Sequence, residues 1–303
     1  MTQRYEGRPL PRPGEELTDQ GLGFDLGTLM SRRNMLRGFG LGAAVLGLAA
    51  CGSNDPVSST SATTTSATST GEIPDETAGP YPGDGSNGPD VLEQSGVVRS
   101  DIRSSFGTAS GTAEGVPMKL ELTILDMADD DAPFKDVAVY VWHCDRDGNY
   151  SLYSDGITGE NYLRGVQIAD SAGKVTFTSV FPACYSGRWP HIHFEVYPSQ
   201  ADITDSTKAI ATSQVALPKA TCDLVYATTG YSKSVTNLSQ VSLANDNVFG
   251  DDSAALQLGT VSGDVTNGFT VALTAKVDTT TTPTGGAAPA GGGGPGGVRP
   301  SSA

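Results

Sequence analysis

Apolar and polar side chains alternate along several stretches in the middle and C-terminal parts of the chain. Such alternation places the apolar residues on one face of an extended strand and the polar residues on the other. It predicts strands over residues 118–127, 137–144, 174–181, 192–197, 241–249 and 269–277. Turn-forming residues separate them at 145–149, 170–174 and 262–268. Helical periodicity is weak, and it favours helices only at 92–98 and 218–227.

Many short strands punctuated by turns predict an all-β fold: a β-sandwich of mainly antiparallel strands with long loops and few short helices. The composition changes at both ends of this region. Residues 51–71 are rich in Ser and Thr, and residues 279–303 are rich in Gly, Pro and Thr. Neither segment carries enough large apolar side chains to form a core. We therefore expect one domain over residues 72–278, between a flexible linker and a disordered tail.

Residues 1–50 have the pattern of an export signal. Arg32 and Arg33 precede a short apolar run that ends at Cys51. The run is too short to span a bilayer, which needs roughly 20 apolar residues, and the paired arginines indicate twin-arginine export. The letters LAAC resemble a lipobox, which predicts a lipid on Cys51 as the only membrane contact, on the outer face of the cell membrane. The competing interpretation is a chance arginine pair before a buried helix.

The net charge and the remaining cysteines bear on the partners, the metal sites and the disulfides that the chain can have. The formal net charge of −15 repels phosphate backbones and argues against a nucleic-acid partner. Cys144, Cys184 and Cys222 form an odd set without the spacing of a zinc site. We expect a disulfide between Cys144 and Cys222, with Cys184 as a buried thiol; a bridge from Cys144 to Cys184 is the competing pairing.

The chain has three histidines, and two of them, His191 and His193, stand one residue apart in a predicted strand. Side chains two residues apart on a strand project to the same side, so both imidazoles can bind one metal ion. Two surface histidines on a polar face are the plainer alternative. His143 is expected to be a hydrogen-bonded structural residue.

The usual third ligand of a zinc site, a nearby carboxylate or cysteine, is not obvious, although Glu195 shares the strand face of the two histidines. Tyr185 lies six residues before His191, and Tyr150 follows the turn at 145–149. Phenolate is a hard anionic donor that suits iron(III) better than zinc or copper(I). Tyr153 and Tyr162 remain alternatives to Tyr150.

Four segments together resemble the intradiol ring-cleavage dioxygenases, nearest the protocatechuate 3,4-dioxygenase branch: GPYPGDG, VYVWHCDRDGNYS, NYLRGVQIAD and FPACYSGRWPHIHF. The resemblance runs over roughly residues 76–220. It implies a single non-haem iron(III) per chain, held by Tyr150, Tyr185, His191 and His193. It also implies catalytic roles for Arg188 and Gln214, and it puts Tyr81 in the substrate pocket. Turn packing is an alternative for Tyr81, and a surface ion pair is one for Arg188.

The activity that the resemblance implies is cleavage of a catechol-type aromatic diol by O2, giving a cis,cis-muconate-type diacid. Tyr185 would act as the base, and Arg188 would stabilise negative charge on the ring. Gln214 would hold Arg188 or the iron-bound oxygen in position. An export signal is unusual for this family and suggests catechols outside the cell as substrates.

Two other functions compete with this one. An exported β-sandwich lipoprotein could capture carbohydrate or metal without catalysis, although Tyr150, Tyr185 and Arg188 would then have no role. A zinc or copper oxygenase on a cupin-type barrel would need more than three histidines. The oligomeric state is not indicated, but no stretch resembles the helical dimerisation segment of catechol 1,2-dioxygenases, so we do not expect that mode of assembly.

Overall fold

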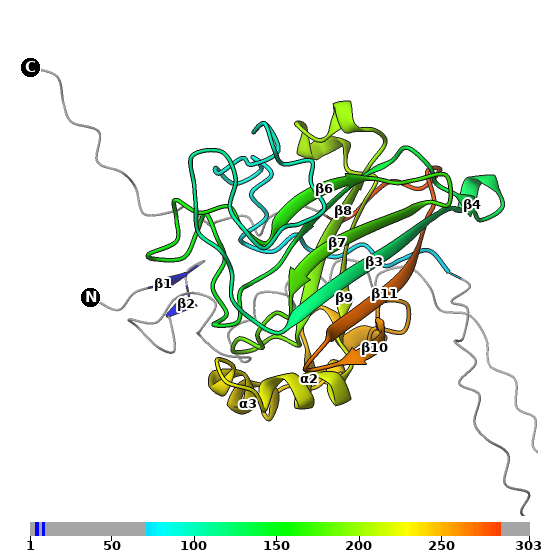
Figure 1. The fold of residues 1–303 in the computed structure, drawn as a ribbon. Helices are drawn as coiled ribbons and strands as arrows, with labels where there is room; N and C mark the ends of the chain where they lie inside the picture. The colour runs from blue at the N-terminus through cyan, green and yellow to red at the C-terminus, as the bar shows by residue number, and fades with distance from the viewer. Residues whose placement is uncertain (1–3, 6–7, 10–70, 286–303) are drawn as a thin grey trace, which may run out of the picture.

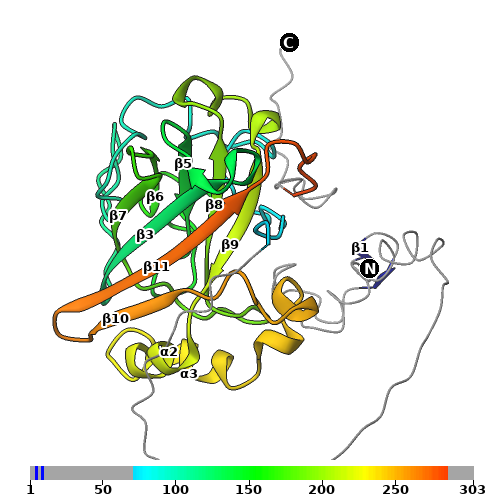
Figure 2. The ribbon, with the colours of Figure 1, turned by 90° about the vertical axis from the view of Figure 1, so that its right-hand side faces the viewer.

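The computed structural model describes residues 4–5, 8–9 and 71–285 (Figure 1). The export signal expected over 1–50, the linker expected over 51–71 and the last part of the expected tail lie almost entirely outside the described residues. The chain from 71 onward forms two facing β-sheets, with loops above one sheet and two short helices at one end (Figure 2). Within the described residues, no helix is long and apolar enough to cross a membrane.

The first sheet has five strands and the second has four. The first contains β3 (Pro117–Asp126), β4 (Ala132–Pro133), β7 (Lys174–Val180), β10 (Thr260–Asp264) and β11 (Gly268–Val277). The second has the order β6 (Arg164–Ile168), β5 (Ala138–Trp142), β8 (His191–Tyr197), β9 (Ala211–Ala216). All pairs are antiparallel except β11 with β3. Outside the sandwich, β1 (Arg4–Tyr5) pairs with β2 (Arg8–Pro9). The predicted antiparallel β-sandwich is therefore confirmed.

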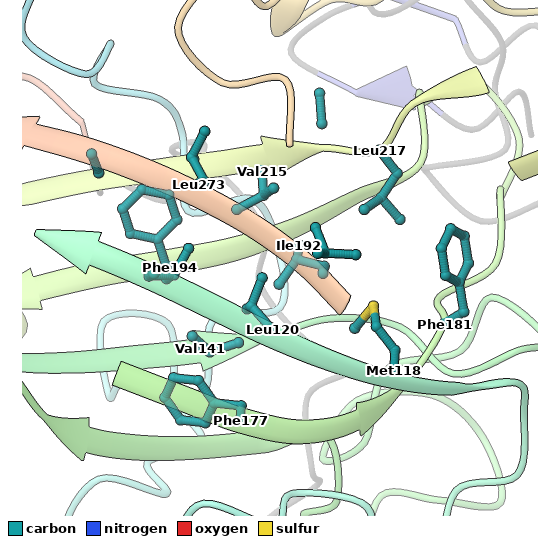
Figure 3. Packing of buried hydrophobic residues seen from close by; sticks show 14 of the residues in the cluster. Met118, Leu120, Val141, Phe177, Phe181, Ile192, Phe194, Val215, Leu217 and Leu273 are labelled. Carbon is teal, nitrogen blue, oxygen red and sulfur yellow. The ribbon is translucent and has the colours of Figure 1, made fainter. Parts of the chain in front are cut away.

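The main core lies between the two sheets. Leu120 and Phe177 from the first sheet face Val141, Ile192 and Phe194 from the second, and all five side chains are almost fully buried (Figure 3). The alternate residues of β5 and β8 point to the opposite face of the second sheet. There they join a separate buried cluster, which loops cover instead of strands. Both faces of this sheet are thus buried, and the outer one holds the polar residues of interest.

The helices and the 3-10 turns correct two of the predictions. The helices are α2 (Lys219–Tyr226) and α3 (Ser232–Leu238), and the 3-10 turns are η2 (Met127–Asp129), η3 (Gln200–Asp202), η4 (Ser206–Lys208), η5 (Leu243–Asn245) and η6 (Phe249–Asp251). The helix predicted at 218–227 is α2, whereas residues 92–98 form turns. The strand predicted at 241–249 is wrong. Side chains there bond to nearby backbone groups, as in the Ser242–Asn245 capping box of η5, and this competes with strand pairing.

The expected disulfide is also wrong, because Cys144, Cys184 and Cys222 are all free thiols in the structure. Cys144 belongs to the outer cluster of the second sheet, whereas Cys184 and Cys222 belong to the main core. Each thiol points to a carbonyl oxygen near its own position in the fold. Burial raises the pKa of the Cys184 thiol to about 12, which keeps it protonated and unreactive.

The first residues of the expected tail pack on the domain. Thr281 Oγ1 donates to the Glu72 carboxylate over 2.9 Å, and the Thr284 amide donates to Asp75 over 2.6 Å. These contacts join the two ends of the domain beside the edge strand β9, since the Glu76 amide donates to the Thr212 carbonyl.

Candidate metal centre

The two histidines of β8 lie on the outer face of the second sheet. Ile192 and Phe194 fill the core on the other face, so alternation along the strand sends His191 and His193 outward together. His193 pairs with Trp142 of β5 on one side and with Gln214 of β9 on the other. Trp142, His193 and Gln214 therefore lie beside one another on three neighbouring strands.

Tyr150 reaches the histidines from the loop that follows β5. The Asp145 carboxylate accepts the amides of Asp147 and Asn149, both over 2.9 Å, and so closes the turn expected at 145–149. Gly148 has a φ of +91°, and a Cβ on it would lie 3.2 Å from the Cβ of Tyr185. Glycine thus lets the turn that carries Tyr150 approach the loop that carries Tyr185.

Donor atoms from these three segments converge on one point. The Tyr185 hydroxyl is 3.1 Å from His191 Nε2, which is 3.1 Å from His193 Nε2. The Tyr150 ring lies 6.0 Å from the Tyr185 ring and 6.3 Å from that of His193, centroid to centroid. The buried Tyr150 hydroxyl has no hydrogen-bond partner among the described residues. An unpaired buried hydroxyl is costly, and a cation bound at this point would satisfy it.

Neighbouring groups orient both imidazoles toward that point. His191 Nδ1 is 2.6 Å from the Trp189 carbonyl oxygen, which fixes the proton on Nδ1 and leaves the Nε2 lone pair free for a metal. The His193 ring stacks on Trp142, with centroids 4.8 Å apart and planes at 6°. Gly79 also approaches this ring, because a Cβ on it would lie 3.4 Å from His193 Cε1.

The electrostatics of the four side chains fit a highly charged cation. Burial lowers the pKa of His191 and His193 well below the usual value, so both imidazoles are neutral and able to ligate. Burial also raises the pKa of Tyr150 and Tyr185, which keeps the phenols protonated in the absence of a cation. A trivalent cation reverses that preference by stabilising the phenolates. Two phenolates and two imidazoles suit iron(III).

Other sets of residues are not placed to bind a metal. Among residues 71–285, no group of three or more His, Cys, Asp or Glu side chains could hold an ion. Glu195, although on the same face of β8, accepts the Tyr197 hydroxyl over 2.8 Å. His143 bonds through Nδ1 to the Cys144 carbonyl and through Nε2 to the Ser179 hydroxyl, each over 2.7 Å. It therefore has the hydrogen-bonded structural position that the sequence predicts.

The two alternatives to Tyr150 have partners elsewhere. Tyr153 donates to the Asn87 side chain over 2.7 Å and accepts the Gly83 amide. The Tyr162 hydroxyl faces the Asp145 carboxylate at 3.5 Å. Neither phenol is directed at the histidines in these contacts.

Arg188 lies beside this site with its side chain 12% exposed. Its Nη2 donates to the Gln214 side-chain oxygen over 2.7 Å, and the Gln214 amide group donates to the Thr77 carbonyl over 3.0 Å. Its Nε donates to Asp246 over 3.0 Å. Burial alone would lower the pKa of Arg188, but Asp246 together with Tyr185 and Tyr150 outweighs burial, and the net shift is upward. Arg188 is thus a permanent cation in a fixed place, and not a surface residue.

Tyr81 forms part of the wall around the site. Its ring lies 4.9 Å from that of Tyr150 and 5.2 Å from that of Tyr153, centroid to centroid. The Tyr81 carbonyl accepts from Arg164, which is almost fully buried and also donates to the Ser151 carbonyl. Arg164 therefore connects the segment that carries Tyr81 to the turn that carries Tyr150.

Sequence reasoning missed three residues near the site. Trp142 stacks on His193, while Asp246 and Phe249 reach Arg188 from the segment wrongly predicted as a strand. The only signal for Trp142 was its position in a strand facing the histidines. Asp246 is 58 residues from Arg188 along the chain, and no local pattern marks such a contact.

The family model that matches this chain and the two solved structures compared with it are all described as dioxygenases. Residues 87–255 match a family model described as a dioxygenase. A solved structure of an intradiol ring-cleavage dioxygenase from Tetranychus urticae is 20% identical in sequence and has a TM-score of 0.56. The match covers 70% of this chain and 96% of the Tetranychus urticae chain. A second dioxygenase structure is 19% identical in sequence and has a TM-score of 0.56; the match covers 72% of this chain and 98% of the second dioxygenase chain. The search of curated proteins returned no match.

Proposed function

The chain belongs to the intradiol ring-cleavage dioxygenase family, and on this premise we propose that it cleaves a catechol between its two hydroxylated carbons. Both atoms of O2 enter the product, a cis,cis-muconate-type diacid. The proposed cofactor is a single non-haem iron(III), and its ligands are Tyr150, Tyr185, His191 and His193. The competing function, a binding lipoprotein without catalysis, gives no role to a buried arginine beside four convergent donors.

One observation carries the proposal: Tyr185 Oη, His191 Nε2 and His193 Nε2 lie in a chain of 3.1 Å contacts. The unpartnered Tyr150 hydroxyl completes the set. Hydrogen bonds among neutral side chains can pair some of these atoms but leave the Tyr150 hydroxyl without a partner among the described residues. A cation that binds all four side chains would supply that partner.

The side chains of this chain have distinct tasks in the reaction. Iron(III) held by the four side chains would supply the Lewis acidity that activates a catechol toward O2. As a phenolate, Tyr185 would accept a catechol proton on its oxygen, which is close to His191. Arg188 stabilises the negative charge that develops on the ring, and Gln214 holds the guanidinium in place. Tyr81, Trp142 and Tyr150 form an aromatic wall that excludes water.

The proposal is tested first by colour and oxygen uptake. We expect the purified protein to contain iron and to be red-brown, because tyrosinate bound to iron(III) absorbs visible light. Anaerobic catechol should shift the absorption, and air should then yield a ring-opened diacid with two oxygen atoms from labelled O2. Iron-loaded, coloured protein that forms no diacid from any catechol would contradict catalysis, and a colourless protein that binds no iron would favour the binding lipoprotein.

We place the chain nearest the protocatechuate branch on the strength of its sequence motifs, and the substrate is proposed only as a catechol. A panel of catechol, protocatechuate and larger plant-type catechols would rank the ring substituents by kcat/KM. A clear preference for unsubstituted catechol over protocatechuate would count against the protocatechuate branch without affecting the reaction class.

We also propose that the protein is exported by the twin-arginine route and anchored on the outer face of the membrane through Cys51. The support is the sequence alone: Arg32 and Arg33, the apolar run and LAAC. Cys51→Ser should remain unprocessed or be released into the medium, as judged by cell fractionation and detergent partitioning. Unchanged partitioning of that variant, with Cys144→Ser as a matched control, would contradict the lipid anchor.

A further inference from the structure

A single buried carboxylate, Asp246, holds together the loop beside the candidate metal centre. Its side chain is 0% exposed. Oδ2 accepts from Arg188 Nε over 3.0 Å and from the Trp189 amide over 2.6 Å. Oδ1 accepts the amides of Val248 and Phe249 over 2.8 and 3.0 Å. One side chain thus joins the loop before β8 to the loop after α3.

The contacts of Arg188 define the plane of its guanidinium group. Nε bonds to Asp246 and Nη2 bonds to Gln214, while the Phe249 ring lies 5.9 Å from Cζ. Because the group is planar and rigid, two bonded nitrogens fix the direction of the third. Nη1 takes part in neither contact. Asp246 on one edge and Gln214 on another therefore determine where Nη1 points.

The same carboxylate also acts on a candidate metal ligand. Asp246 Oδ2 accepts the Trp189 N–H, and the carbonyl of Trp189 accepts from His191 Nδ1 over 2.6 Å. Trp189 is itself anchored, because its indole N–H donates to the Leu217 carbonyl over 2.9 Å. Asp246 thus supports the positions of both His191 and Arg188.

We propose that Asp246 is a positioning residue for ring cleavage, which fixes the guanidinium of Arg188 so that Nη1 faces the substrate ring. This inference rests on the proposed function. Its action is indirect, because Asp246 contacts Arg188 and Trp189, not the reacting atoms. A misplacement of about 1 Å in a catalytic group can cost on the order of 10²-fold in rate, so the loss of this support should be visible in turnover.

The test begins with Asp246→Asn, which keeps the size of the side chain and can still accept the Val248 and Phe249 amides. We expect iron content and the catechol-induced colour change to remain, while kcat falls roughly 10- to 100-fold. Asp246→Glu retains the charge and should recover part of the loss. The measurements are oxygen uptake on iron-quantified protein and anaerobic catechol titration, well below the unfolding temperature. The matched control is Asp170→Asn, whose carboxylate accepts two amides in its own exposed turn and whose variant should match the wild type.

A double-mutant cycle separates positioning from general structural support. If Asp246 acts through Arg188, adding Asp246→Asn to Arg188→Ala should cost little further turnover. Should Asp246→Asn not fold, the same cycle is run with Asp246→Glu, whose loss should likewise vanish in Arg188→Ala.

Three outcomes would overturn the inference: wild-type turnover in Asp246→Asn, a full additional loss in the Arg188→Ala background, or Asp246→Glu being worse than Asp246→Asn. The last two would assign Asp246 a purely structural role. An inactive but iron-loaded wild type would instead contradict the proposed function, so the two failures are distinguishable.

Discussion

Tyr150→Phe is expected to lose both the iron and the visible colour. The substitution removes one hydroxyl that has no protein partner and leaves the ring that packs on Tyr81. The fold should therefore remain, while the site loses one of two anionic donors. Changes to groups that merely support a ligand cost about 10- to 100-fold in metal affinity, so we expect a larger loss here. Iron analysis and the visible spectrum measure it.

The same substitution has an expected effect on the metal-free protein. A buried hydroxyl without a partner is unfavourable, and its removal should leave the free energy of unfolding unchanged or raise it by about 1 kcal/mol. Thermal unfolding of the two metal-free proteins would show this. A marked destabilisation of metal-free Tyr150→Phe would mean that the hydroxyl has a structural partner.

Two matched variants serve as controls for Tyr150. Tyr153→Phe loses its bonds to Asn87 and Gly83, and Tyr162→Phe loses its contact with Asp145. Each should cost about 1 kcal/mol of stability and keep the iron and the colour. If Tyr153→Phe were the colourless variant, the ligand assignment would be displaced along the chain.

The sandwich could be predicted from alternation because its strands bury at least one face consistently. Leu120, Leu122 and Ile124 of β3 show this directly, since every second residue enters the core. Strand β9 (Ala211–Ala216) was harder, because its polar residues contact segments distant in sequence, among them the one around Pro74 and Thr77. Burial by a segment distant in sequence leaves no local pattern.

The candidate site shows the same division between local and distant information. The shared face of His191 and His193 follows from strand geometry, and their convergence with Tyr150 and Tyr185 is what the family resemblance leads one to expect. The support for Arg188 could not be foreseen, because Asp246 lies in a stretch whose alternation imitates a strand. Asp246 there accepts the amides of Val248 and Phe249, which turns the backbone away from any strand partner. The disulfide prediction failed for a similar reason, since the sequence does not show that Cys144 lies on the outer face of the second sheet and Cys222 in the main core.

Arg188→Ala is expected to separate binding from chemistry. Arg188 donates to Gln214 and Asp246 and is not one of the four convergent donors, so iron and colour should remain. Turnover should fall on the order of 10²–10³-fold, the usual cost of losing one preorganised charge-stabilising donor. Arg188→Lys keeps the charge but lacks the planar fork that spans both partners, and its loss should be smaller.

Steady-state oxygen uptake on iron-quantified protein, beside anaerobic titration with catechol, measures the two parts separately. Arg103→Ala is the matched control, because Arg103 forms an exposed ion pair with Asp101 and should be dispensable for turnover. Near-normal turnover in Arg188→Ala would leave the guanidinium with only a structural task. Loss of iron in that variant would mean that Arg188, through Trp189 and the loop it shares with His191, supports the metal and not the substrate. Retained iron with slow turnover would support a role for Arg188 in stabilising the reacting ring.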